Sequence, residues 1–221
     1  ARDGDLVVSL GTSGTIFGVT SMRPQDKTGA ISGFADASGL FLPIAVTLNA
    51  ARILSTTANL LGVDFEEFAE LALEAPIGSD GLVLVPYFEG ERTPNLPNAK
   101  ASLHGMSISS TTRANLARAS IEGMLCGLNA GLNALRSIGV QGTRILLIGG
   151  AAQNRAVQEV ARTIFSLRID VPAPGEYVAE GAAIQAAWAV TGTRPDWAVE
   201  FSESLSPLTN PAVMQGYSEH A

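Results

Sequence analysis

The sequence predicts an α/β domain built on one mixed central sheet flanked by helices. Short apolar, β-branched runs separated by turn residues dominate the first 50 residues, which is typical of antiparallel strands. From about residue 112, helical and strand patterns alternate, which is typical of parallel strands joined by helices. Apolar residues make up 46% of the 221 residues. This share supplies a substantial core and disfavours disorder.

Four strands are expected at the start of the chain. Asp5–Leu10 runs into a turn, Gly11–Gly14, and two strands separated by about four turn residues form a hairpin. The three following strands cover Thr15–Thr20, Ile31–Ala37 and Leu40–Val46. We expect the four strands to pair in chain order, as a β-meander.

Helices and further strands follow, and Asp64 is suited to be a helix N-cap. Helices are expected over Asn49–Leu61, Asp64–Glu74, Thr112–Ser137, Gln153–Phe165 and Glu180–Val190, and strands over Leu82–Tyr87, Arg144–Ile148 and Leu167–Val171. Phe88–His104 contains Pro94 and Pro97 and is expected to be an ordered loop. The tail from Gly192 is expected to be irregular or to form short helices.

Small residues mark two of the expected helices. Glycines recur every four residues at Gly123, Gly127 and Gly131 of the long helix, and close packing against a sheet explains them better than a membrane role. Glu180–Ala187 is also rich in small residues, which favours a packing role over a binding one.

The charge balance excludes some functions. Fourteen Lys and Arg against 21 Asp and Glu give a net charge of −7, which disfavours nucleic-acid binding. It does not exclude small nucleotides, because backbone amides, helix N-termini and magnesium can screen their phosphates. No apolar stretch reaches the ~20 residues that span a membrane. The single cysteine, Cys126, fits a buried position and a reducing cytoplasm, where we expect the protein.

No metal site made of side chains is expected. His104 and His220 have no metal-ligand spacing with each other or with Cys126. The acidic cluster of the second helix fits a solvated face; its members are Glu66, Glu67, Glu70 and Glu74.

The hairpin turn is the first candidate phosphate-binding motif. Gly11 and Gly14 flank two hydroxyl residues, Thr12 and Ser13, so backbone amides can approach a phosphate without side-chain bulk. An ordinary hairpin turn explains the same residues equally well. The motif is neither a serine-hydrolase elbow, because Thr15 stands where glycine is needed, nor a Walker A loop.

A second candidate lies where a buried strand meets a helix. Gly149, Gly150 and Ala151 follow Leu146–Ile148 and precede Asn154, without forming a Gly-x-Gly-x-x-Gly fingerprint. Glycines here let a ligand lie against the backbone, and the helix start favours anions. Tight strand–helix turns also need glycine for structural reasons alone.

In order, these motifs resemble the C-terminal domain of the FGGY family of carbohydrate kinases. The most specific match is Ala101–Met106, followed after eight residues by Asn115–Glu122, which satisfies the family's second signature. The Gly11–Gly14 hairpin is similar to the family's second phosphate motif, and Ile148–Ala151 to its adenosine motif. Glu180–Ala187 is similar to its second connecting motif, a packing helix between lobes.

The resemblance implies a fold, a cofactor and a site. The fold would be the ribonuclease H-like domain of actin-like ATPases, over residues 1–221. ATP and Mg²⁺ would be the cofactors, with no side-chain metal ligand in this chain. The residues expected at the nucleotide are Gly11, Thr12 and Ser13 at the terminal phosphates, Gly149, Gly150 and Ala151 under the ribose and α-phosphate, and Asn154 at the adenine. The start of the Asn49–Leu61 helix would also border the phosphates, where Ala51 stands in place of the family's frequent glycine and its methyl group could crowd the nucleotide.

The resemblance also implies an acceptor and a missing half. Leu84–Tyr87, Gly90–Pro94 and Asn98–Lys100 are similar to xylulokinases, which implies D-xylulose as the sugar. The family's catalytic aspartate would lie upstream of Ala1, because Asp3 and Asp5 are too close to the hairpin. The N-terminal sugar-binding lobe would be absent, and the chain alone inactive. A homodimer is compatible with the sequence.

Alternatives remain open from the residues alone. The parent enzyme could act on ribulose, gluconate or glycerol, since the acceptor lobe decides that choice. The chain could also be a non-catalytic actin-like ATP-binding module, or a structural α/β domain whose glycines serve packing. Glu91 and Arg92 could shape the cleft between lobes, or form an ion pair that orders their loop.

Overall fold

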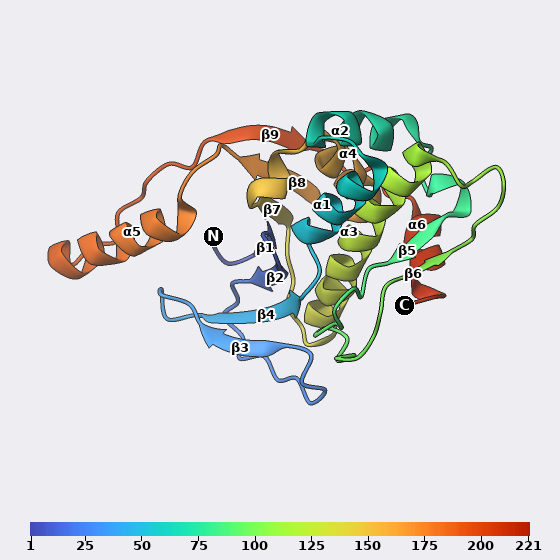
Figure 1. Ribbon diagram of the computed structural model, residues 1–221. Coiled ribbons are helices and arrows are strands. Elements are labelled where there is room, and N and C mark those ends of the chain that lie inside the picture. The colour runs from blue at the N-terminus through green and yellow to red at the C-terminus, as the bar shows by residue number, and fades with distance from the viewer.

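The computed structural model describes residues 1–221 and shows one seven-stranded mixed sheet in the order β3-β4-β2-β1-β7-β8-β9, with β5 and β6 forming a separate pair (Figure 1). The strands are Asp5–Leu10 (β1), Gly14–Gly18 (β2), Ser32–Ala35 (β3), Phe41–Thr47 (β4), Val83–Val85 (β5), Ser102–His104 (β6), Arg144–Ile148 (β7), Arg168–Pro172 (β8) and Phe201–Leu205 (β9). β7 pairs in parallel with β1 and β8, and the other neighbours are antiparallel. The predicted mixed α/β sheet is confirmed.

Helices α1 to α4 lie on one side of the sheet, while α5 projects on the other side (Figure 1). The helices are Ala51–Leu61 (α1), Phe65–Glu74 (α2), Arg113–Ser137 (α3), Arg155–Ile164 (α4), Tyr177–Thr191 (α5) and Pro211–Ser218 (α6), with short 3₁₀ turns at Ser79–Gly81 (η1) and Gly150–Gln153 (η2). Asp64 caps α2 as predicted, accepting from the amides of Glu66 and Glu67. None of the helices combines the length and apolar composition that crossing a bilayer requires.

The predicted β-meander is wrong, because β3 does not lie between β2 and β4. Strand β4 pairs with both, which leaves β3 at the sheet edge. The seven residues of β4 alternate between buried and half-buried positions, whereas three of the four β3 residues are exposed. A short strand with little apolar surface gains little from an interior position, which explains its place at the edge.

Two strands fall where the sequence predicts none. β6 lies within the segment Phe88–His104 that was predicted to be a loop, and β9 lies within the tail after Gly192. β9 reads Phe-Ser-Glu-Ser-Leu and is mostly exposed, so it carries no hydrophobic signal. Its ladder with β8 is joined by a hydrogen bond from Ser204 Oγ to Asp170 Oδ1 at 2.7 Å.

The glycine stripe of α3 does serve close packing. A Cβ atom at Gly123 would lie 2.2 Å from the Leu84 carbonyl oxygen of β5, and one at Gly131 would lie 3.0 Å from Ile16 of β2. Gly127 instead faces Tyr217 of α6. The core therefore sits between the sheet and α3, where Cys126 is also buried, and burial raises the pKa of its thiol.

Helix α5 differs from the other helices because none of its residues is buried. Its sequence is apolar except for Glu180, Gln185 and Thr191, and Val178 and Val190 are 90% and 88% exposed. A cavity of about 320 Å³ separates Ile184 of α5 from Val7 and Leu146 on the sheet. The far face of the sheet is therefore only loosely covered.

Candidate functional site

The turn after β1 is exposed, and its side-chain hydroxyls make no hydrogen bond within the chain. Gly11, Thr12 and Ser13 all lie at the surface, and neither hydroxyl bonds to another group of the chain. The Gly11 carbonyl accepts a hydrogen bond from the Ala51 amide of α1 at 3.0 Å. The hydrogen bond to α1 therefore holds the turn in place, while the hydroxyls of Thr12 and Ser13 face solvent.

The second glycine motif lies beside the first. β1 and β7 are parallel neighbours with Ser9 opposite Ile148, so both strands leave the sheet at the same edge. Carboxyl ends of parallel strands are the usual place for ligands in α/β sheets. Gly149 packs directly on β1, since a Cβ atom there would lie 2.5 Å from the Leu10 carbonyl oxygen. The structure thus brings the two predicted motifs together.

Gly149 and Gly150 are glycines for different reasons. Gly149 has φ of +98° as well as the close Leu10 contact, so the fold itself requires glycine there. Gly150 has no such φ, and a Cβ atom would meet nothing within 4 Å. Neither backbone strain nor packing therefore explains why residue 150 is glycine, and the space beside it is open.

A cavity of about 600 Å³ opens above these glycines. Gly149 and Gly150, the end of β1 and the segment leading from β8 into α5 line it. The lining residues are Ser9, Ile148, Gly149, Gly150, Gln153, Pro174, Gly175, Glu176, Tyr177 and Val178. This volume falls in the range of small-molecule and cofactor sites.

Asn154 follows Gln153, which lines the cavity, but does not line it itself and has a structural task. Its Oδ1 atom accepts hydrogen bonds from the amides of Ala156 at 2.9 Å and Val157 at 3.3 Å, which caps the N-terminus of α4. Its Nδ2 group makes no hydrogen bond within the chain. Capping thus fixes the side chain while leaving both N–H donors of its Nδ2 group free for a ligand.

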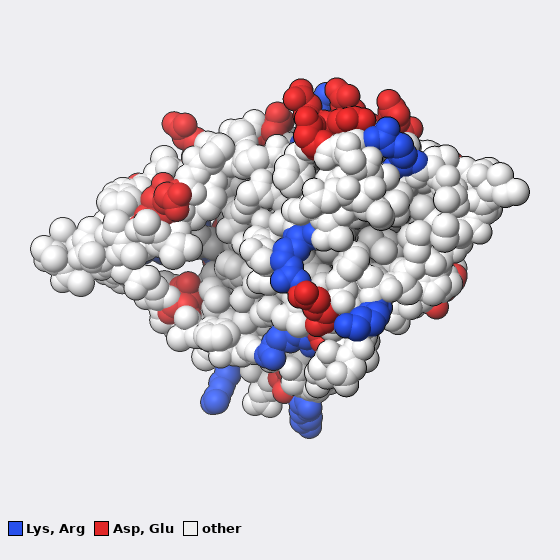
Figure 2. Space-filling view, viewed as in Figure 1, with Lys and Arg blue, Asp and Glu red and all other residues white.

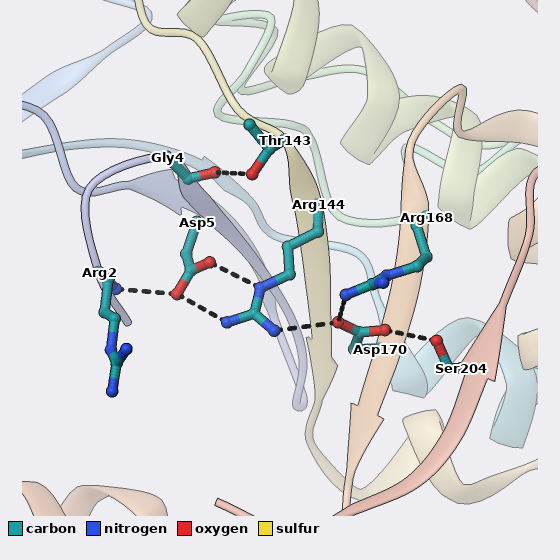
Figure 3. A network of polar contacts seen from close by, with 8 residues as sticks. All are labelled: Arg2, Gly4, Asp5, Thr143, Arg144, Arg168, Asp170 and Ser204. Carbon is teal, nitrogen blue, oxygen red and sulfur yellow. Dashed lines mark hydrogen bonds and ion pairs between the residues drawn. The ribbon is translucent and has the colours of Figure 1, made fainter. Parts of the chain in front are cut away.

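Asp5, close to the N-terminus, does not resemble a catalytic base. Asp5 Oδ1 accepts from Arg144 Nε at 2.7 Å, and Arg144 also reaches Asp170 at 3.1 Å (Figure 3). Burial favours a higher pKa for Asp5, but the hydrogen bonds from Arg144 and the Arg2 amide outweigh it and lower the pKa. A carboxylate held ionised by a neighbouring cation is a weak proton acceptor. Its network instead joins β1, β7 and β8.

The other candidate residues take no part in a metal site. The acidic residues of α2 form an exposed cluster at the top of the molecule (Figure 2), and no group of three His, Cys, Asp or Glu residues could hold a metal ion. His104 and His220 do meet, with stacked rings 4.1 Å apart, a contact that sequence spacing did not reveal.

Sequence reasoning did not identify the role of the residues around α1. The predicted alternative of an ion pair between Glu91 and Arg92 is wrong, because Glu91 forms no salt bridge. Its carboxylate instead binds the Leu48 amide and the Asn49 side chain. These partners lie about 40 residues away in the sequence, so no local pattern signals them.

The residues of the predicted signature are structural. Asn115 hydrogen-bonds Asp80 and Ser110, and Arg118 pairs with Glu122 at 2.7 Å inside the protein. Glu122 also accepts from the amide of Gly78 and the hydroxyl of Ser79, which fixes the turn after α2. The most specific part of the sequence pattern therefore identifies the fold rather than the chemistry.

Comparisons with known proteins agree with this arrangement. A profile of the FGGY family of carbohydrate kinases, C-terminal domain, matches residues 6–190. Xylulose kinase of Streptomyces rubiginosus is 43% identical over 195 residues, covering 88% of this chain and 39% of that protein. Xylulose kinase of Haemophilus influenzae is 37% identical over 188 residues, covering 85% and 38%. The chain thus spans less than half the length of these relatives.

Solved structures give the same result. The xylulose kinase from Bifidobacterium adolescentis matches with a TM-score of 0.91 at 45% identity, over 99% of this chain and 44% of that one. The Plasmodium falciparum glycerol kinase with ADP shares the fold, with a TM-score of 0.83 at 18% identity over 99% of this chain and 46% of that one. The expected ribonuclease H-like, actin-like fold is confirmed, and the chain belongs to the FGGY family of carbohydrate kinases.

Proposed function

We propose that this chain is the nucleotide-binding lobe of a kinase that phosphorylates D-xylulose to D-xylulose 5-phosphate with ATP. The observation that carries the nucleotide site is Gly150, a glycine that neither backbone strain nor packing requires, on the floor of a cavity of about 600 Å³. The sugar is inferred from the relatives that are named xylulose kinases, at 43% and 37% identity.

The two glycine motifs, of which Gly149 and Gly150 line the cavity, fit ATP. The phosphates would lie against Gly11, Thr12 and Ser13, whose amides and free hydroxyls can donate hydrogen bonds. The ribose and α-phosphate would lie over Gly149, Gly150 and Ala151, and the free Nδ2 group of Asn154 would donate to the adenine. Mg²⁺ would be held through phosphate oxygens, where it neutralises the charge of the group in transfer.

The catalytic base and most sugar contacts would come from an N-terminal lobe. Phosphoryl transfer needs a carboxylate that accepts the proton of the sugar hydroxyl. Asp5 is engaged by Arg144, and the chain spans only 39% of its relative from Streptomyces rubiginosus. The exposed apolar surface of α5 fits the predicted role of this helix in packing between lobes. We therefore propose that the 221 residues alone transfer no phosphate.

Two assays test this proposal. Calorimetric titration of the chain with Mg-ADP and Mg-ATP is expected to show saturable binding at one site, and its absence would contradict the nucleotide-lobe assignment. Incubation with Mg-ATP and D-xylulose is expected to release no ADP. Release that depends on D-xylulose would show that the chain is catalytic by itself.

The choice of sugar needs the complete parent protein. Its rates with D-xylulose, D-ribulose, gluconate and glycerol are expected to be highest with D-xylulose. A faster rate with another acceptor would reassign the substrate and leave the nucleotide lobe unaffected. A parent protein without any acceptor-dependent activity would favour the non-catalytic ATP-binding module.

A further inference from the structure

Glu91 is a buried carboxylate without a cation. The residue is 3% exposed, and no Lys, Arg or His lies within ion-pair distance. Burying an unpaired charge is strongly unfavourable unless hydrogen bonds compensate. The compensating donors therefore show which part of the structure this residue serves.

Three donors surround the Glu91 carboxylate. Oε1 accepts from the backbone amides of Leu48 and Arg92, both at 2.7 Å. Oε2 accepts from Asn49 Nδ2 at 3.0 Å, and this nitrogen also donates to the Gly90 carbonyl at 2.8 Å. The side chains thus fasten the loop around Glu91 to the corner between β4 and α1.

That corner, residues 47–51, contacts both ends of the glycine turn. At one end, the Ala51 amide donates to the Gly11 carbonyl at 3.0 Å. At the other, Thr47 pairs with Gly14 across the β2–β4 ladder. The residues bound by Glu91, Leu48 and Asn49, lie between these two contacts. Displacement of the corner would therefore move the turn that holds Thr12 and Ser13.

We propose that Glu91 is a positioning residue, which holds the corner 47–51 and through it the Gly11–Ser13 turn in the geometry that phosphate binding needs. This inference rests on the proposed function, because the turn matters only if it receives the nucleotide. Glu91 does not contact the nucleotide itself. It acts through preorganisation, which reduces the ordering that binding would otherwise require.

Glu91→Gln tests the role with almost no change of shape. One carboxylate oxygen becomes an NH₂ group that faces either Asn49 Nδ2 or the two backbone amides, so a donor meets a donor. Glu89→Gln is the matched control, because it makes the same change in the same loop at an exposed residue paired with Arg52. Exposed ion pairs of this kind contribute little to stability.

Two measurements separate positioning from general stability. We expect Glu91→Gln to weaken Mg-ADP binding about tenfold and to speed exchange of the Ala51 amide about tenfold, whereas Glu89→Gln changes each less than twofold. Wild-type binding and exchange in Glu91→Gln would overturn the inference. If the wild-type chain binds no Mg-ADP, the proposed function fails for this chain, and Ala51 exchange without nucleotide decides the inference alone.

A second variant serves if Glu91→Gln does not fold. Asn49→Ala removes one donor and leaves the two backbone amides on Glu91, so a smaller loss of about threefold in both measurements is expected. Retention of wild-type affinity and Ala51 protection in this variant would then overturn the proposal.

Discussion

Adjacent glycines in the β7–η2 turn carry different constraints. Gly149 has positive φ and backbone atoms of Leu10 against it, whereas Gly150 faces open space. The first residue is therefore required by the fold, whereas no contact within the chain requires the second to be glycine. The structural reason that the sequence offered for both glycines, a tight strand–helix turn, therefore holds for Gly149 and not for Gly150.

The two residues should respond differently to the same change. Gly149→Ala is expected to lower the free energy of unfolding by about 1–3 kcal/mol, through strain at positive φ and overlap with Leu10. Gly150→Ala is expected to change it by less than about 0.5 kcal/mol. Urea unfolding of both variants measures the difference. Equal destabilisation would mean that the whole motif serves packing.

Among individual residues, the sequence predicted those whose role depends on their neighbours in the chain. Gly11–Ser13 and Gly149–Ala151 directly follow apolar strands, so both turns can be recognised from the sequence. The function of Glu91 depends on partners at Leu48 and Asn49, and long-range contacts leave no periodicity. Asn154 was expected at the adenine, yet its capping of α4 became visible only in the structure.

Among the elements, the strands of the central sheet are joined by ion pairs as well as by backbone ladders. Arg144 of β7 bridges Asp5 of β1 and Asp170 of β8, and Ser204 of β9 extends the network (Figure 3). Burial favours a higher pKa for Asp170. The hydrogen bonds from Ser204, Arg168 and Arg144 outweigh this effect and lower its pKa below 3.8.

This network predicts a dependence of stability on acid. The pKa values of Asp5 and Asp170 are lowered in the folded state, so their contribution is present above pH 3.8 and is lost as pH falls through the lowered values. Arg144→Gln removes the shared cation and should flatten the dependence below pH 3.8. Measuring the free energy of unfolding of wild type and Arg144→Gln across this pH range tests the prediction. The same slope against pH in both proteins would contradict it.

The glycines of α3 provide a second test of packing between elements. Gly123→Ala is expected to be strongly destabilising, because its Cβ would lie 2.2 Å from the rigid Leu84 carbonyl. Gly127→Ala would meet only the Tyr217 hydroxyl at 3.4 Å and should gain up to about 1 kcal/mol from helix propensity. Thermal unfolding distinguishes them, and similar melting temperatures would be inconsistent with this packing.

The sequence predicted most elements because their burial is periodic. α3 and β7 were expected within a residue of their observed bounds, since both pack against the core. β6 and β9 were missed because one is very short and the other polar. The order of β3 and β4 in the sheet depends on which strand gains more by burial. Predicting where each strand lies in the sequence does not predict that order.

For the whole molecule, α5 is the part that the rest of the chain stabilises least. Its amides are expected to exchange with solvent much faster than those of α3, because no side chain of α5 is buried. Hydrogen exchange measured over Tyr177–Thr191 tests this. Amide exchange as slow as in α3 would mean that a second copy of the chain covers this helix in solution.

The proposed function places a nucleotide on the glycine turns at the shared edge of β1 and β7. The most direct measurement is calorimetric titration with Mg-ADP of wild type, Gly150→Asp and Gly33→Asp. The control Gly33 lies on edge strand β3 with nothing within 4 Å, so it receives the same change away from the cavity. Binding by wild type and Gly33→Asp, and none by Gly150→Asp, is the predicted result. Undiminished binding by Gly150→Asp would contradict the placement of the nucleotide on these turns.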